Sequence, residues 1–312
     1  MRDARAVGAV LLASLCFATT GTAQALAEVD ASPVAVGLAR IALGGVLLGA
    51  VAVRLARVPS SSRASTTAEG RGASLLGRLP PAALVAVGAT GVVAYQPTFF
   101  EGTERNGVAV GTVVALGSAP VVTGVLDALL SRRAPTLRWC VATVLALLGV
   151  VCVAGLLDGG ASTGAAVLWS VGAGGSYALY TLAAKELLGR GWSAARTMGV
   201  LFGVAGVVSL PVLAVLAGAW LLTPAGLVLV VWLGVVTTTV AYLLFGWGLA
   251  RLPAPEVATL TLAEPLCATL LGVGLLDERL GLVAGVGLLV LAAGLALLAT
   301  GAREPAAVRG VV

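Results

Sequence analysis

The chain has 312 residues, of which 59% are hydrophobic and 11% are charged, with a formal net charge of +5. Soluble domains average about 45–50% apolar and about 25% charged residues, so this composition excludes an ordinary water-soluble fold. A bilayer accepts such a chain when each apolar segment forms a helix of about 20 residues. Helix is required because lipid cannot satisfy free backbone N–H and C=O groups.

Ten apolar stretches, separated by charges or by proline and glycine clusters, predict ten transmembrane helices. They cover residues 7–27, 33–53, 80–100, 108–130, 137–157, 163–183, 197–217, 224–249, 255–276 and 280–300. The longest polar break, residues 54–79, is rich in small and basic residues, which is typical of a loop without a core. The sequence therefore predicts an all-α polytopic membrane protein, and its partner is the lipid bilayer.

Basic residues gather on one side of the ten spans. Sixteen of the 19 Lys and Arg residues fall on that side, whereas the other side has only Arg105 and Arg279, and Arg40 lies inside a span. Short cytoplasmic loops retain Lys and Arg. We therefore expect a multi-pass protein of the cell (inner or plasma) membrane with both termini cytoplasmic. The positive net charge then reflects topology and indicates no nucleic-acid partner.

An internal repeat relates the two halves of the chain. "FFEGTERNGVAVGTVVALGSAPVVTGVL" (99–126) aligns with "GWGLARLPAPEVATLTLAEPLCATLLGV" (246–273), which places Pro120 opposite Pro265. Five spans in each copy is an odd number, so the second copy must enter the membrane from the other side. Inverted repeats of this kind are typical of secondary transporters, which bind substrate near the midplane. The predicted units are residues 1–157, with the cytoplasmic loop 54–79, residues 158–302, and a cytoplasmic tail at 303–312.

Several motifs resemble those of EamA-domain members of the drug/metabolite transporter superfamily. The second copy carries "YALYTLAAKEL" at 177–187 and "ARLPAPEVATLTLAEPLCATLLGVGLLDERL" at 250–280, and the first carries "GLARIALGGVLL" at 37–48. The resemblance implies ten helices in two inverted five-helix repeats, a central cavity, and export of small polar metabolites such as amino acids. One departure is that Arg132 and Arg133 stand where the second copy has Asp277 and Glu278, which puts a symmetric loop contact in doubt.

Glu264 is an acid near the middle of the ninth predicted span. An acid at that depth costs about 2.5–3.5 kcal/mol on insertion scales, so it should face the bundle interior or water. Pro265 follows directly and removes the N–H that would bond to the carbonyl of Thr261, so a helix kink and a free carbonyl beside the acid are expected. Pro120 predicts a related kink. The alternative is a structural Glu264 that is hydrogen-bonded across helices.

A carboxyl that changes its protonation state with access could couple protons to transport, and the chain has no histidine that could do so instead. Arg40 is the cation within the spans. Three roles stay open for its guanidinium: pairing with Glu264, binding a substrate carboxylate, or reaching the outer interface. Permanent pairing of Arg40 with Glu264 would remove the proton carrier.

Further polar and aromatic side chains within the spans are candidates for a cavity wall. Trp169, Ser176 and Tyr180 share one face of the sixth predicted helix, while Tyr95, Tyr242 and Trp247 lie in the third and eighth spans. Core packing explains each aromatic residue equally well. Gln96 has a stronger claim, because an amide within a span needs polar partners.

The sequence favours an alternating-access exporter of a small polar metabolite, with amino acids first and proton coupling as an option. A multidrug or nucleoside permease is the alternative. A membrane-embedded enzyme is disfavoured because the chain has no histidine and no paired acids within its spans. Cys16, Cys140, Cys152 and Cys267 all lie within spans as small apolar fillers, so neither a metal site nor a cofactor is expected.

Overall fold

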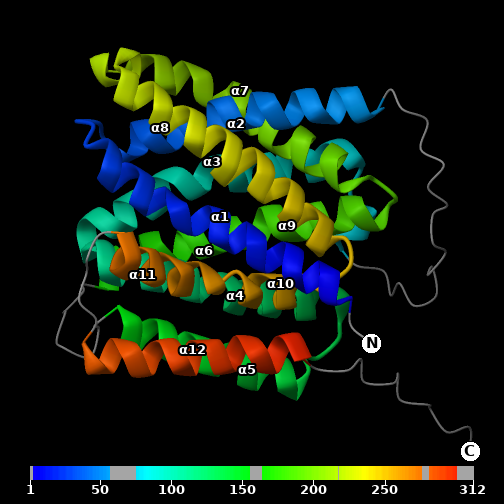
Figure 1. The fold of residues 1–312 in the computed structure, drawn as a ribbon. Coiled ribbons are helices and arrows are strands. Elements are labelled where there is room, and N and C mark those ends of the chain that lie inside the picture. The colour runs from blue at the N-terminus through cyan, green and yellow to red at the C-terminus, as the bar shows by residue number, and fades with distance from the viewer. Residues whose placement is uncertain (1–2, 57–74, 155–163, 217, 276–280, 301–312) are drawn as a thin grey trace, which may run out of the picture.

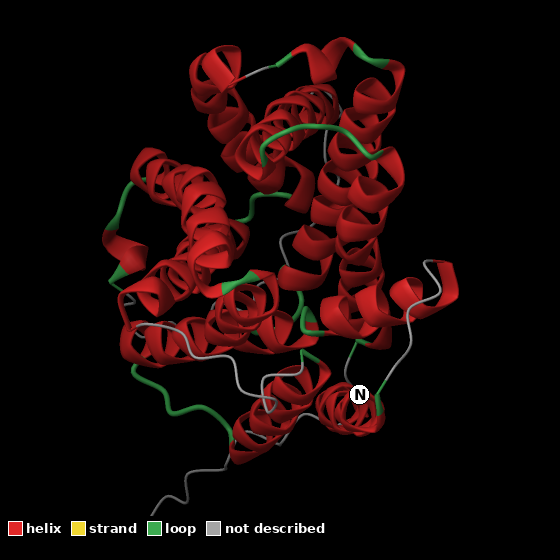
Figure 2. Cartoon of the chain, turned by 90° about the vertical axis from the view of Figure 1, so that its left-hand side faces the viewer, coloured by secondary structure: helices red, strands yellow, loops and turns green. Residues whose placement is uncertain are grey.

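The computed structural model describes residues 3–56, 75–154, 164–216, 218–275 and 281–300. Most of the predicted 54–79 loop, the junction between the predicted repeats, the predicted tail 303–312, and Asp277 with Glu278 lie outside the described residues. The described elements are all helical (Figures 1 and 2). The main helices are α1 Ala4–Ala27, α2 Pro33–Ala56, α3 Pro81–Asn106, α4 Val108–Ser131, α5 Leu137–Val153, α6 Gly164–Gly189, α7 Ala194–Leu216, α8 Pro224–Gly234, α9 Ala241–Leu249, α10 Ala254–Leu260, α11 Ala263–Leu275 and α12 Leu282–Thr300. Short turns of helix at η1 Leu76–Arg78 and η3 Ala219–Leu222, and the π-helix η4 Val235–Val240, complete the order.

The all-α, polytopic fold class predicted from the sequence is confirmed. Eight described helical segments are long and apolar enough to cross a membrane, and α5 is a shorter apolar helix of 17 residues. Each of the ten predicted spans coincides with helical structure in the part of the chain that is described. The inverted relation between the two halves stays a prediction.

Two helices extend beyond the apolar stretches that predicted them. The ion pair between Glu101 and Arg105 lies in the last turns of α3, and the pair between Glu186 and Arg190, at 3.0 Å, lies at the end of α6. Oppositely charged side chains four residues apart stabilise an exposed helical turn. Polar turns therefore continue these helices past the hydrophobic segment.

Two predicted spans are interrupted. Between α8 and α9 the backbone widens into the π-helix η4, where the hydroxyls of Thr237 and Thr238 donate to the Leu233 carbonyl at 2.8 and 2.9 Å. The predicted ninth span is divided into α10 and α11 at Thr261 and Leu262. Such irregular backbone at membrane depth is tolerated where it is buried in protein or lines a cavity.

The helices pack as neighbours in space that are distant in sequence. In Figure 1, α2 lies against α7, α5 lies beside α12, and α1 lies near α9 and α11. The α2–α7 contact is close enough that a Cβ on Gly199 would lie 2.5 Å from the Leu48 carbonyl oxygen. Small residues allow this close approach of membrane helices.

Basic side chains bind the C-terminal ends of helices at one end of the bundle. Lys185 donates to the carbonyls of Leu249 and Leu252, each at 2.7 Å, and Arg138 donates to those of Leu297 and Leu298. Cations stabilise helix C-termini because the last carbonyls lack backbone partners. These contacts place part of the predicted cytoplasmic arginine-rich set at one end of the molecule.

Candidate functional site

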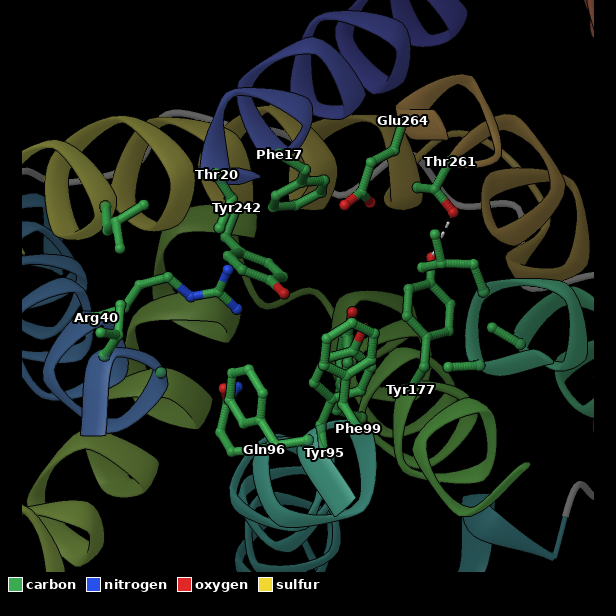
Figure 3. A pocket seen from close by; sticks show the side chains of 18 of the residues that line it. Phe17, Thr20, Arg40, Tyr95, Gln96, Phe99, Tyr177, Tyr242, Thr261 and Glu264 are labelled. Atoms are coloured by element: carbon green, nitrogen blue, oxygen red, sulfur yellow. Dashed lines mark hydrogen bonds between the residues drawn. The ribbon is translucent and has the colours of Figure 1, made fainter. Parts of the chain in front are cut away.

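A cavity of about 130 Å³ lies among α1, α2, α3, α4, α6, α9 and the α10–α11 break. Figure 3 shows its lining side chains converging from these separate elements. The polar lining residues are Thr20, Gln24, Arg40, Gln96, Thr261 and Glu264, and the aromatic ones are Phe17, Tyr95, Phe99, Phe100, Tyr177, Tyr180 and Tyr242. The cavity is therefore an aromatic chamber with a few convergent polar groups, the usual character of a small-molecule site.

Arg40 supplies the cationic side of the cavity. It lies in the second turn of α2, and the helix begins at Pro33, so the cavity is displaced toward the end of the bundle where α2 starts. The Nε atom of Arg40 is buried and has no hydrogen-bond partner. The hydroxyl oxygen of Thr20, on the facing α1, is also buried without a partner. Two residues that line one cavity thus each carry a buried polar atom without a partner.

A glycine opens the space next to Arg40. Gly37 lies one turn before it on α2, and a Cβ there would lie 2.5 Å from Gln96 Oε1 and 2.6 Å from Phe100 Cε2. Gln96 is only 3% exposed. The glycine therefore lets α3 bring an amide and an aromatic ring directly against α2.

The break between α10 and α11 places Glu264 in the first turn of α11. At the break the chain turns tightly: the Leu262 N–H bonds to the Thr259 carbonyl at 3.1 Å, and the Glu264 N–H bonds to the Thr261 carbonyl at 2.9 Å. The sequence predicted that the Thr261 carbonyl would lack a hydrogen-bond partner. That prediction is wrong, because the Glu264 N–H bonds to this carbonyl. The expected irregularity before Pro265 is present as an interruption of the helix.

The two sides of the break are held differently. Trp139 Nε1 donates to the Pro255 carbonyl at 3.0 Å, and the Thr143 and Thr259 hydroxyls are 2.8 Å apart, so α5 fastens α10. Within α11, only Ala263 and Gly272 are fully buried. The α10 side is thus the more firmly anchored one.

Arg40 and Glu264 face the same cavity from opposite walls. Figure 3 shows Arg40 entering from α2 and Glu264 from α11, with both side chains directed inward. No ion pair with an N···O distance of 4.0 Å or less joins them, and the Glu264 side chain has no hydrogen bond to the described residues. The permanent Arg40–Glu264 pair considered from the sequence is therefore absent from this structure.

Aromatic rings close the cavity toward the basic end of the bundle. Tyr242 packs against Phe202 with ring centroids 3.9 Å apart and against Phe245 at 5.9 Å, and Tyr180 lies 6.1 Å from Tyr242. Phe202 and Phe245 are essentially inaccessible to solvent. The side of the cavity nearer the arginine-rich end is therefore a packed aromatic wall.

Six of the nine predicted binding or coupling residues line this cavity: Arg40, Tyr95, Gln96, Tyr180, Tyr242 and Glu264. The other three lie elsewhere. Trp169 is 41% exposed and makes a cation–π contact with Arg105. The Ser176 hydroxyl donates to the Gly172 carbonyl of its own helix at 2.8 Å. Trp247 makes a cation–π contact with Arg251.

Distance along α6 explains why Trp169 lies away from the cavity. Trp169 lies 11 residues before Tyr180, which is about 16 Å along a helix at about 1.5 Å per residue. Sharing a helix face with Tyr180 therefore does not bring Trp169 to the cavity. At the two predicted kinks the structure differs: α4 stays helical through Pro120, from Val108 to Ser131, whereas the helix is interrupted just before Pro265.

Several lining residues were not predicted from the sequence. Phe17, Thr20, Phe99, Tyr177 and Thr261 are the main ones. Two of them carried a usable signal: Thr261 lies one turn before Glu264, and Tyr177 lies one turn before Tyr180. Residues one turn apart share a helix face. The contribution of α1 had no such signal, because its neighbours are set by tertiary packing.

The donor set does not suggest a metal. Among the residues that the structure describes, no three His, Cys, Asp or Glu side chains gather into a group that could hold a metal ion. The site is instead built from one cation, one acid, hydroxyls, amides and rings.

Comparisons with known proteins agree with this architecture. The EamA-like transporter family matches residues 4–155 and again residues 164–300. A Bacillus subtilis (strain 168) protein named "Uncharacterized transporter YwfM" is 35% identical over 295 residues, covering 95% of this chain and 94% of the relative. A solved structure described as "Crystal structure of protein" has the same fold, with a TM-score of 0.75, 17% identity, and coverage of 95% of this chain and 96% of the other. The chain therefore belongs to the EamA-like transporter family, as its motifs indicated.

Proposed function

We propose that this chain is a secondary transporter that exports small zwitterionic metabolites, amino acids foremost, by alternating access. The observation that carries the proposal is the placement of Arg40 and Glu264 on facing walls without an ion pair. A carboxylate would bind the Arg40 guanidinium, and an ammonium group would bind the Glu264 carboxylate. A zwitterion satisfies both groups at once.

The unsatisfied atoms around the cavity support a polar occupant. Arg40 Nε and the Thr20 hydroxyl oxygen are buried without partners. Leaving a buried polar group unpaired costs about 1–3 kcal/mol. A substrate that supplies the missing hydrogen bonds gains that stabilisation on entry, whereas a hydrocarbon ligand does not.

Size and charge together disfavour the multidrug alternative. Drug-sized sites occupy about 300–1,000 Å³, whereas this cavity has about 130 Å³. A lipophilic cation would bring a like charge toward Arg40. A nucleoside could stack on the tyrosines but would leave both charged groups without partners.

The proposed cycle uses the two predicted repeats, residues 1–157 and 158–302, as the units that exchange roles. Each contains one of the two family matches. With the termini in the cytoplasm, the cavity lies in the outer half of the membrane and the aromatic wall faces the cytoplasm. A carboxyl that binds a proton in one state and the substrate ammonium in the other would couple export to the proton gradient.

The test is transport by purified protein in proteoliposomes with an imposed pH gradient. Tritiated alanine, a nucleoside and a lipophilic cation are compared for wild type and Glu264→Gln. We expect gradient-dependent transport of alanine by wild type alone. Equal gradient-driven transport by both proteins would remove Glu264 as the proton carrier, and transport of the lipophilic cation alone would favour the multidrug alternative.

A further inference from the structure

The break between α10 and α11 deprives the Ala258 carbonyl of its usual backbone partner. In an unbroken helix the Leu262 N–H would bond to the Ala258 carbonyl, but here it bonds to Thr259. The Thr261 hydroxyl replaces the Leu262 N–H as the donor and lies 2.7 Å from the Ala258 carbonyl oxygen. The Thr261 side chain therefore completes the end of α10.

Tyr177 of α6 extends this arrangement. Its hydroxyl oxygen lies 3.3 Å from Thr261 Oγ1, as the dashed line in Figure 3 shows. A threonine hydroxyl has a single hydrogen, and the carbonyl of Ala258 can only accept. The hydrogen bonds must therefore run in one direction, from Tyr177 to Thr261 and from Thr261 to Ala258.

Thr261 connects these bonds to Glu264. Its carbonyl accepts the Glu264 N–H at 2.9 Å, so one residue is bonded to Tyr177 and Ala258 through its side chain and to Glu264 through its backbone. Tyr177 is itself fixed, since it is 8% exposed and its ring contacts Tyr180 with centroids 5.1 Å apart. The rest of α11 offers few fully buried residues that could hold its first turn.

We propose that Tyr177, acting through the Thr261 hydroxyl, is the positioning residue for the Glu264 carboxylate in the transport site. The inference rests on the proposed function for the role of Glu264. Loss of the Tyr177 hydroxyl relaxes the break and lets the first turn of α11 shift, so that the substrate ammonium meets a displaced carboxylate. One ordinary hydrogen bond contributes about 0.5–1.5 kcal/mol, which corresponds to about a 2- to 12-fold change in apparent affinity.

A double-mutant cycle tests this route. The apparent KM for tritiated alanine is measured in proteoliposomes by alanine–alanine exchange without a pH gradient, which needs no proton carrier, for wild type, Tyr177→Phe, Glu264→Gln and the double variant. We expect Tyr177→Phe to raise KM several-fold in the wild-type background and to have no further effect in Glu264→Gln. Thr261→Val should behave like Tyr177→Phe, and Thr261→Ser, which keeps a hydroxyl, should be close to wild type. An equal effect of Tyr177→Phe in both backgrounds would mean that Tyr177 acts without Glu264 and would overturn the proposal.

A second measurement does not depend on transport. Amide hydrogen exchange of residues 258–266 is followed in the intact protein, with Ser209→Ala as the control, because that buried hydroxyl bonds within α7 to the Ala205 carbonyl. We expect faster exchange in Tyr177→Phe and Thr261→Val, and wild-type exchange in Ser209→Ala. If wild type carries no alanine, the proposed function fails. Exchange in Tyr177→Phe that matches wild type would overturn the positioning role itself.

Discussion

Arg40 of α2 and Glu264 of α11 carry opposite charges into one cavity and do not pair with each other. In a low-dielectric interior two such groups attract strongly, so keeping them on separate walls requires rigid placement by their helices. Gly37 and Gln96 fix the surroundings of Arg40, and the break at Thr261 fixes those of Glu264. The separation leaves room for a ligand with both charges.

Replacement of Arg40 tests the carboxylate side of the site. Arg40→Met removes the charge and the donors while keeping a long apolar stem. Because a hydrogen bond to a charged group contributes about 1.5–3 kcal/mol, we expect the apparent KM for a zwitterion to rise about 10- to 150-fold. Competition transport measures the effect. Arg105→Met is the matched control, since Arg105 is exposed and pairs with Glu101 on the same helix. A wild-type KM in Arg40→Met would contradict carboxylate binding there.

Gly37 is expected to control the size of the cavity. In Gly37→Ala the new methyl group would meet Gln96 Oε1 and Phe100, which must move toward the cavity. Transport of amino acids with larger side chains should fall before that of alanine. Gly21→Ala on α1 is the control, because nothing lies within 4 Å of a Cβ at that position. Unchanged substrate preference in Gly37→Ala would show that this contact does not limit the cavity.

The α2–α7 contact gives a prediction about stability. In Gly199→Ala the methyl group would overlap the Leu48 carbonyl and the Ala52 side chain. Overpacking of a tight contact costs about 1–3 kcal/mol, so the thermal unfolding midpoint in detergent should fall by several degrees. Gly203→Ala, where the nearest atom would be an ordinary 3.6 Å away, should unfold near the wild-type temperature. Equal midpoints for both variants would count against the close contact.

Pro265 is expected to maintain the helix break. Pro265→Ala restores an N–H that can compete with Glu264 for the Thr261 carbonyl, so a continuous helix becomes possible and Glu264 would rotate. We expect at least a tenfold loss of transport together with slower amide exchange in residues 258–266. Pro120→Ala provides the comparison, because α4 is already helical through Pro120. Wild-type transport and exchange in Pro265→Ala would show that other contacts fix the break.

The sequence predicted the ten helices well because hydrophobic length is a direct physical requirement of the bilayer. The sequence indicated for a similar reason that Arg40, Gln96 and Glu264 lie at an interior cavity, since polar groups at depth must face protein or water. A polar or charged side chain at membrane depth costs free energy unless protein or water surrounds it, so few positions in the fold can hold one.

The aromatic residues were predicted less well because they are stable both in a core and at a cavity wall. Trp169 and Tyr180 lie on one face of α6, yet Trp169 is exposed near the start of the helix and Tyr180 is buried at the cavity. The spacing of Tyr177 to Tyr180 could have indicated its place at the cavity, but its hydrogen bond to Thr261, 84 residues away, could not be predicted. Only the packing of α6 against the broken span brings those two hydroxyls together.

The most direct test of the central claim is a selectivity measurement of tritiated alanine exchange without a pH gradient, with three competitors: alanine, N-acetylalanine and alanine methyl ester. The wild-type protein should prefer alanine to both blocked analogues, because each analogue lacks one of the two charges. Glu264→Gln should lose the preference over N-acetylalanine only, and Arg40→Met should lose the preference over the methyl ester only. If both variants kept the wild-type order of preference, the substrate would not bridge these two residues.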